Sequence, residues 1–189
     1  VIGGLTSKAA CELHLQEGPP VCAGGVDCGV ATLGLGVLSP GNYSVAIGTS
    51  MCAALIHKSN NLSEDLIHWP YVWQAKDLTY SFGGGATAGA VVKWFRDQLA
   101  RLEKQAECSG GENAYAVLDR EAEKIAPGSD GVIVLPYFMG ERSPLWDSHA
   151  KGVIFGLSLA HTRAHLYRAF LESVAFSLRH TMDGAGQDI

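Results

Sequence analysis

The chain has 189 residues, of which 47% are hydrophobic and 17% are charged, and its formal net charge is −5. So low a charge fraction with this apolar content argues against disorder and predicts one domain, or one domain with part of another. The acidic balance and the lack of a basic block argue against a nucleic-acid partner, and every apolar run is shorter than the roughly 18 residues of a membrane span.

The first 40 residues predict short elements separated by glycine and proline turns. Thr6 or Ser7 can cap a helix over residues 8–15, which the run Gly18-Pro19-Pro20 ends. A strand over 21–23 leads into a turn that carries Asp27, and a small helix is expected over 28–36.

Two strands and a less regular segment follow. The strands are expected over 43–48 and 52–57, and the bend Gly48-Thr49-Ser50 joins them. Residues 58–78 are polar with aromatic interruptions, which predicts a loop or a short hairpin. A glycine-rich run over 83–89 then opens the next helical segment.

The second half of the chain is mainly helical in pattern. Apolar spacing predicts one helix over 87–104, in which Ala88, Val91, Val92, Phe95, Leu99 and Leu102 fall at helical spacing. A second helix is expected over 113–125, a buried strand over 132–135 and an irregular segment over 136–161. The longest helix begins after Thr162 as N-cap. Because strands and helices alternate, the fold class is α/β.

Cysteine and histidine patterns indicate neither a disulfide framework nor a metal site. The five cysteines are odd in number and form no C-x-x-C pair, so we expect reduced, mostly buried thiols in a cytoplasmic protein. His161 and His165, at i and i+4, come closest to a metal-binding spacing. We interpret both as surface or capping residues at a helix start.

Asp27 is the first candidate for chemistry. It lies in a run of small residues, with no basic residue within ten positions on either side. A sugar hydroxyl has a pKa far above neutrality, so its attack on a phosphate needs a base such as a positioned aspartate. The alternative interpretation is a turn aspartate that bonds its own backbone.

The bend Gly48-Thr49-Ser50 ends an apolar strand with successive N–H groups and two hydroxyls, a common way to hold a phosphate. Small residues over 83–89 could likewise let a phosphate or nucleotide ring reach a helix N-terminus, or could serve only to turn the chain. The neighbours Glu141 and Arg142 could touch a ligand, but we favour a role in holding their loop through ion pairs and Arg–carbonyl bonds.

From Gly140 to Glu172 the chain closely resembles the C-terminal signature of the FGGY family of carbohydrate kinases. The likeness rests on Gly140 to Asp147, on Lys151 to Leu157 and on the segment from His161 to Glu172. Segments 24–27, 48–50 and 83–97 precede it in the family's order. The resemblance implies an actin/hexokinase/Hsp70-like (ribonuclease H-like) ATPase fold with ATP and Mg²⁺ as cofactors.

The same resemblance assigns expected roles to individual residues. Asp27 matches the catalytic base, which also contacts the sugar, and Cys28 follows it where glycerol kinases carry Gln, which argues against glycerol. Thr49, with Gly48 beside it, matches the phosphate-binding position. The remaining two matches are to nucleotide contacts: Gly89 matches a glycine, and Lys93 stands where relatives often carry Gln.

The resemblance also implies a domain division. Residues 1–41 match the tail of an N-terminal kinase domain that carries the base, and 42–189 match a C-terminal domain truncated before its last strand. Both ends of the chain look cut, so we expect the chain alone to be inactive and to expose apolar surface that favours self-association, with a homodimer left open.

Two functions remain in view. The first is ATP-dependent phosphorylation of a sugar hydroxyl, with a pentulose such as xylulose or ribulose as the small-molecule substrate and Asp27 as general base. The second is a kinase-like sugar- or nucleotide-binding or regulatory protein without catalysis; the presence of Asp27 favours the enzyme. A Rossmann-type protein is excluded, because no G-x-G-x-x-G lies at a strand-to-helix turn.

Overall fold

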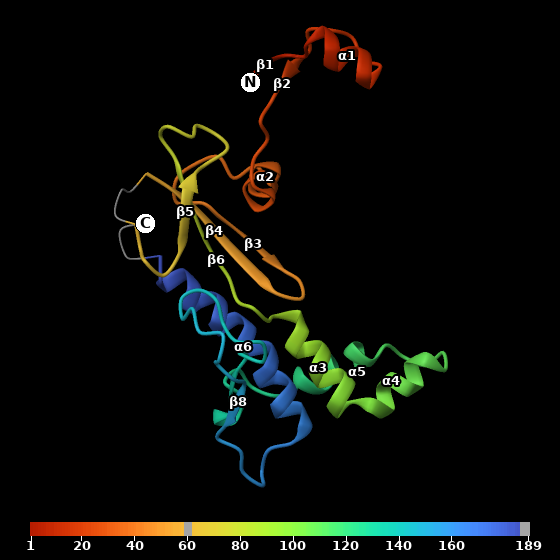
Figure 1. Ribbon diagram of the computed structural model, residues 1–189. Helices are drawn as coiled ribbons and strands as arrows, with labels where there is room; N and C mark the ends of the chain where they lie inside the picture. Colours follow the sequence, from red (N-terminus) through yellow and green to blue (C-terminus); the bar gives the residue numbers. More distant parts are fainter. Residues whose placement is uncertain (59–61, 186–189) are drawn as a thin grey trace.

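The computed structural model describes residues 1–58 and 62–185. Its elements form three successive parts, which Figure 1 shows from top to bottom. A small N-terminal unit is followed by a four-stranded sheet that one helix crosses, and a mainly helical part lies at the far end of the sheet.

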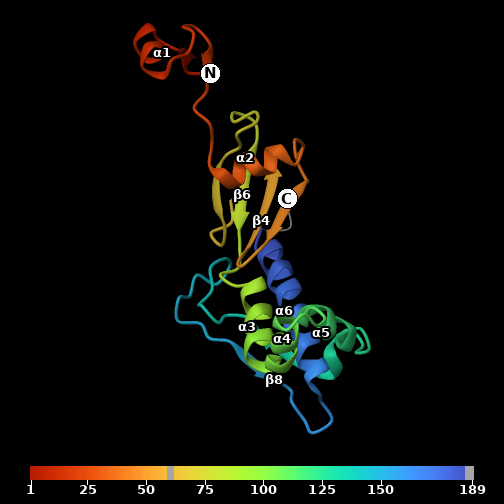
Figure 2. The same cartoon turned by 90° about the vertical axis from the view of Figure 1, so that its right-hand side faces the viewer.

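The N-terminal unit contains a two-stranded ladder and one helix. β1 (Gly3–Gly4) pairs antiparallel with β2 (Pro20–Val21), and α1 (Ser7–Leu13) lies between them. The hydroxyl of Thr6 accepts the Ala9 N–H at 3.4 Å, which confirms the predicted cap. This unit extends away from the sheet in Figures 1 and 2 and buries little of its own apolar surface.

The sheet has the order β3-β4-β6-β5, and all neighbours are antiparallel. Its strands are β3 (Tyr43–Ile47), β4 (Met51–His57), β5 (Ile67–Pro70) and β6 (Thr79–Gly83). Alternation along β4 turns Ala54 and Ile56 to one face, where they pack with Tyr80 of β6. On this face α2 (Asp27–Gly34) crosses the strands near the end opposite the β3–β4 turn (Figures 1 and 2).

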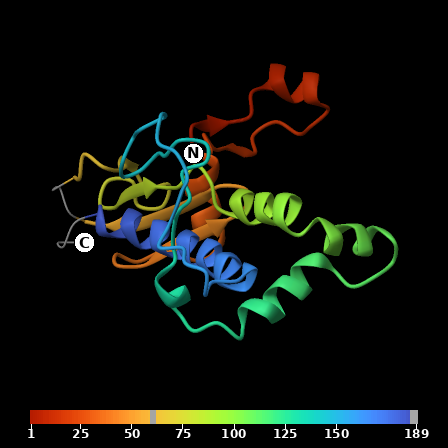
Figure 3. The ribbon, with the colours of Figure 1, turned by 90° about the horizontal axis from the view of Figure 1, so that it is seen from below.

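The helical part is organised around the longest helix, α6 (Arg163–Asp183). The other elements of this part are α3 (Gly89–Leu99), α4 (Arg101–Cys108), α5 (Ala114–Ala122), the 3₁₀ turn η1 (Ser129–Gly131), β7 (Ile133–Leu135) and β8 (Val153–Phe155). α6 packs against α3, α5 and β7, and Figure 3 shows it running alongside α3. Thr162 and His165 form a capping box at its start, which confirms the predicted N-cap.

An aromatic cluster joins α3 to α6. Phe95 of α3 lies with its ring centroid 5.1 Å from that of Tyr167 and 5.3 Å from that of Phe170. Trp94 stacks on Phe170 at 5.9 Å, and Phe138 closes the cluster with an edge contact to Trp94 at 5.0 Å. Phe95, one of the apolar residues that the spacing picks out in α3, therefore packs on the longest helix, and this contact fixes α3 against it.

The single helix predicted over 87–104 is wrong, because the chain breaks at Ala100 into α3 and α4. Ala100 has φ −130° and ψ 43° and is buried, whereas Leu102 is exposed. α4 buries none of its residues, so no packing contact favours a straight continuation of α3 through residues 101–108. The bend instead brings the Lys104 ammonium within 2.8 Å of the Asp97 carboxylate.

Three smaller expectations also need correction. The segment predicted as a loop or short hairpin contributes β5, while residues 59–61 within it lie outside the described residues. The irregular segment over 136–161 contains β8, which pairs with β7. In the strand predicted as buried, Val132 and Val134 are buried, but Ile133 and Leu135 are half exposed. The cysteines are free but not mostly buried, since Cys11, Cys22 and Cys108 are exposed.

Within the described residues, no helix combines the length and the apolar character that a membrane crossing needs.

Phe170 supports a testable prediction about this core. Replacing it with Ala removes a fully buried ring, so we expect the free energy of unfolding to fall by about 3–5 kcal/mol. Phe176 lies on the same helix with 61% of its surface exposed, and Phe176→Ala should cost less than about 1 kcal/mol. Urea denaturation of both variants measures the difference, and equal losses would contradict this description of the core.

Candidate functional site

A cleft of about 510 Å³ lies between the β3–β4 turn and the exposed side of α3. Its lining residues are Gly48, Thr49, Gly89, Ala90, Lys93, Trp94, Asp97, Gln98 and Tyr115. The fold thus brings together all four residues that the sequence assigned to nucleotide binding: Gly48, Thr49, Gly89 and Lys93.

Backbone hydrogen bonds fasten the turn to the start of α3. The carbonyl of Thr49 accepts the N–H groups of Ala88 and Ala90 at 2.9 and 3.1 Å, and the carbonyl of Gly48 accepts that of Gly89 at 2.8 Å. The first donors of the helix are therefore already used. A phosphate in the cleft would therefore have to bond to groups other than the N–H groups of residues 88–90.

Glycines make this close contact possible. A Cβ added to Gly89 would lie 2.6 Å from the carbonyl oxygen of Gly48, and one added to Gly84 would lie 2.1 Å from that of Met51. Neither glycine has a positive φ. These two glycines are thus required for close packing of backbone on backbone, rather than for turning the chain.

Thr49 presents free polar groups to the cleft. It is exposed at the tip of the turn, and neither its N–H nor its hydroxyl forms a hydrogen bond with a described residue. A donor N–H and a hydroxyl on one residue at the end of a strand are suited to an anionic oxygen.

The cleft has a positive balance of charge. Asp97 is the only acid among its described lining residues, and its carboxylate accepts hydrogen bonds from Lys104 at 2.8 Å and from Arg96 at 2.7 Å. These two cations, Lys104 first, hold the pKa of Asp97 below its ordinary value. Lys93 forms no ion pair with a described residue, so its ammonium remains available to a ligand.

Five lining residues were not predicted as site residues: Ala90, Trp94, Asp97, Gln98 and Tyr115. Asp97 follows Gly89 and Lys93 at successive four-residue steps, so the helical period alone places it on the same face. Tyr115 belongs to α5, and its ring lies 4.8 Å from the guanidinium carbon of Arg96. No sequence pattern signals that contact, because it depends on the bend at Ala100.

Asp27 and Cys28 do not line this cleft. Both lie in the first turn of α2, where the Asp27 carboxylate accepts the Cys28 N–H at 2.7 Å through one of its two oxygens. This is the bond that the alternative interpretation requires, although the second oxygen of the exposed carboxylate stays free for a ligand. Cys28 is half-buried and packs against the sheet cluster that contains Tyr80.

Packing against Val72 sets the position of Asp27. A Cβ on Gly25 would lie 2.3 Å from Cγ1 of Val72, so the segment before α2 lies tightly on the loop after β5. The lack of a side chain at Gly25 thus lets these two segments of the chain come into contact.

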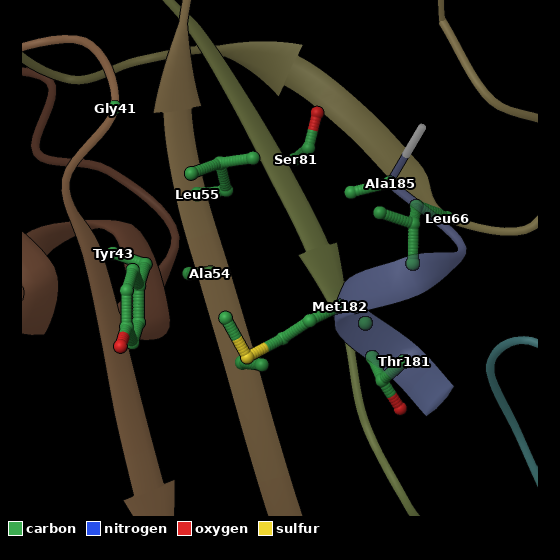
Figure 4. Close-up of a pocket in the computed structure, with 11 residues that line it drawn as sticks. Gly41, Tyr43, Ala54, Leu55, Leu66, Ser81, Thr181, Met182 and Ala185 are labelled. Carbon is green, nitrogen blue, oxygen red and sulfur yellow. The ribbon is translucent and has the colours of Figure 1, made fainter. Parts of the chain in front are cut away.

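A second cavity, of about 220 Å³, lies between the end of α6 and the sheet. Figure 4 shows the side chain of Met182 of α6 extending toward Ala54 of β4, and Thr181, Tyr43 and Leu55 also line the cavity. It contains no predicted site residue and no charged side chain among its described lining residues.

The histidines expected at a helix start lie there. His165 completes the capping box, and His161 accepts the Ser158 N–H at 2.9 Å. Within residues 1–58 and 62–185, no group of three or more His, Cys, Asp or Glu residues is placed to hold a metal ion.

Comparisons with known proteins show that this chain is similar to carbohydrate kinases. The C-terminal domain of the FGGY family of carbohydrate kinases matches residues 43–189. A gluconokinase of Bacillus subtilis (strain 168) is 32% identical over 173 residues, which cover 90% of this chain and 33% of that protein. A xylulose kinase of the same strain is 30% identical over 185 residues, which cover 96% of this chain and 34% of that protein. The chain thus spans about a third of the length of these curated relatives.

Solved structures agree with these matches. The crystal structure of xylulose kinase from Rhodospirillum rubrum has a TM-score of 0.84 and 32% identity, over 98% of this chain and 36% of that one. The crystal structure of Plasmodium falciparum glycerol kinase with ADP has a TM-score of 0.67 and 26% identity, over 84% of this chain and 30% of that one. The predicted α/β fold of the actin/hexokinase/Hsp70-like class is confirmed.

Gly89→Ala tests the contact between turn and helix. The added methyl group would press on the Gly48 carbonyl, and we expect a loss of about 1–3 kcal/mol in unfolding free energy. Gly34, at the end of α2, has nothing within 4 Å of an added Cβ, so Gly34→Ala should be neutral or stabilise by up to about 1 kcal/mol. Thermal unfolding compares the two, and a Gly89→Ala variant as stable as wild type would refute the close contact.

Proposed function

We propose that this chain, which belongs to the FGGY family of carbohydrate kinases, takes part in ATP-dependent phosphorylation of a sugar hydroxyl. The observation that carries the proposal is the gathering of Gly48, Thr49, Gly89 and Lys93 around one cleft of positive charge balance. Phosphoryl transfer depends chiefly on positioning and on stabilising negative charge, and these residues can do both.

In this proposal the cleft binds the phosphates of ATP. The hydroxyl and N–H of Thr49 donate hydrogen bonds to phosphate oxygens, and the Lys93 ammonium adds a positive charge one helical turn beyond Gly89. Because Asp97 is already held by two cations, we assign it no role in binding a metal ion. Mg²⁺ would enter with the nucleotide and neutralise charge on its phosphates.

Asp27 is the proposed general base. Its free carboxylate oxygen would accept the proton of the sugar hydroxyl, and Cys28 would contribute to the sugar site. Since Asp27 lies on α2 and does not line the phosphate cleft, base and phosphate must be brought together around the substrate. Because the chain spans only about a third of the length of its curated relatives, we also expect the 189-residue chain alone to show no sugar-dependent release of ADP.

The substrate class follows the relatives, which are a gluconokinase and xylulose kinases together with ribulokinases such as that of Shouchella clausii. We propose a pentulose, xylulose or ribulose, as the acceptor.

Three expectations from the sequence remain predictions: the domain boundary between residues 41 and 42, the cytoplasmic location and the homodimer. A kinase-like binding protein without catalysis is the second candidate, because the Asp27 carboxylate bonds its own backbone.

Asp27→Asn distinguishes the two candidates. In the complete polypeptide we expect kcat with Mg-ATP and a pentulose to fall by about 10²–10⁴-fold, since the amide cannot accept the proton. Binding of ATP should barely change. Asp77→Asn, at an exposed aspartate outside both α2 and the cleft, is the matched control and should leave kcat unaltered. Near-normal turnover of the Asp27→Asn variant would remove Asp27 from the mechanism.

Thr49→Val tests the phosphate contact. The substitution removes a hydroxyl that would donate a charge-assisted hydrogen bond, and ATP binding should weaken by about 1.5–3 kcal/mol. Thr49→Ser keeps the hydroxyl and should retain most of the affinity, while sugar binding should change little in either variant. Titration with Mg-ATP measures the effect; unchanged affinity in Thr49→Val would reduce the turn to a structural bend.

A further inference from the structure

Glu141 and Arg142 hold the two sides of a single peptide group in the glycine segment before α3. Oε1 of Glu141 accepts the Ala86 N–H at 2.7 Å, and Nη2 of Arg142 donates to the Gly85 carbonyl at 3.1 Å. The N–H of Ala86 and the C=O of Gly85 belong to the same peptide bond. One charge-assisted hydrogen bond on each side therefore fixes the orientation of that peptide plane.

This peptide group is directly linked to the cleft. The Gly85 carbonyl also accepts the N–H of Met51, the first residue of β4 after the Gly48–Ser50 turn, at 3.1 Å. Two residues after Ala86, the Ala88 N–H donates to the Thr49 carbonyl. The peptide thus lies between the end of the phosphate turn and the start of the helix that carries Lys93.

The two side chains are themselves held firmly. The Glu141 N–H donates to the Asp147 carbonyl at 2.8 Å, and the Trp146 N–H donates to the Arg142 carbonyl at 2.6 Å, so their loop is closed on itself. Oε1 of Glu141 also accepts the Arg142 N–H at 2.7 Å. The loop therefore presents carboxylate and guanidinium to the glycine segment in one fixed arrangement.

Removing the charged groups of Glu141 and Arg142 from water has a desolvation cost, so stability of the fold alone does not account for this arrangement. Glu141 is 5% exposed, and its second oxygen, like Nε of Arg142, forms no hydrogen bond with a described residue. Charged groups removed from water contribute little net stability even when they are paired. Neither residue lines the cleft, and their hydrogen bonds to the Gly85–Ala86 peptide connect them to the segment that borders it.

We propose that Glu141 and Arg142 are positioning residues of the nucleotide site, which set the spacing between Thr49 and α3 by clamping the Gly85–Ala86 peptide. The inference rests on the proposed function of the cleft. Because a misplacement of about 1 Å can cost 10²-fold in rate, loss of the clamp should lower kcat/KM for ATP by roughly 10–100-fold. KM for the sugar should stay within about twofold.

Glu172 provides a matched control elsewhere in the fold. Its carboxylate also holds a glycine segment, accepting the Gly128 N–H at 3.0 Å, and it also pairs with an arginine, Arg168, at 2.7 Å. Neither residue lines the cleft. Glu172→Ala therefore removes bonds of the same kind without touching the segment before α3.

The first experiment is hydrogen exchange, which needs no assumption about activity. In Glu141→Ala we expect the amides of residues 86–90 to exchange roughly tenfold faster than in wild type. Glu141→Gln, whose amide oxygen can still accept both N–H groups, should stay near wild type, and so should Glu172→Ala in this segment. Unchanged exchange over 86–90 in Glu141→Ala would overturn the clamp.

The second experiment is kinetic, in the complete polypeptide with Mg-ATP and a pentulose. A selective loss in kcat/KM for ATP in Glu141→Ala, restored in Glu141→Gln and absent in Glu172→Ala, supports the positioning role. Should Glu141→Ala not fold, Arg142→Met removes the donor to the Gly85 carbonyl while keeping an unbranched side chain, and it is expected to show the same selective loss. Wild-type ATP kinetics in a folded variant that lacks the clamp would overturn the inference.

The two proposals fail differently. If the wild-type protein neither binds Mg-ATP nor phosphorylates any sugar, the proposed function fails, and the nucleotide role of Glu141 and Arg142 fails with it. If the wild type is an active kinase and Glu141→Ala matches it in ATP kinetics, only the clamp is refuted.

Discussion

The carbonyl groups of Gly48 and Thr49 bind the first N–H groups of α3, and most of the cleft depends on this contact. A helix start needs partners for its unpaired donors, and a strand-connecting turn supplies them without any side chain. The contact requires the backbones to approach so closely that Gly89 has no room for a Cβ. Thr49 and Lys93, which lie on different elements, thereby come to line the same cleft.

The rest of the fold supports that contact from both sides. On one side the antiparallel sheet fixes the turn, because β4 is paired with both β3 and β6. On the other side α3 is held against α6 by the cluster around Phe95 and Phe170. The Glu141–Arg142 loop meets the segment between them, where the Gly85 carbonyl accepts hydrogen bonds from both Met51 and Arg142.

Electrostatics make the cleft suitable for an anion. Its one described acid, Asp97, is neutralised by Arg96 and Lys104, and the bend at Ala100 is what brings Lys104 close enough. A straight helix would carry position 104 along the axis, away from a carboxylate seven residues earlier. The break in the helix therefore contributes to the charge of the site as well as to its shape.

The sequence by itself determined the strands of the β3–β4 hairpin, the caps at Thr6 and Thr162 and four of the nine cleft residues. These features follow from local spacing, from side chains that bond nearby backbone and from motifs in a fixed order. Only the tertiary structure decided that the helix breaks at Ala100, that Tyr115 joins the cleft and that the glycines pack backbone against backbone. Those outcomes depend on contacts between residues far apart in the chain, and no local pattern records them.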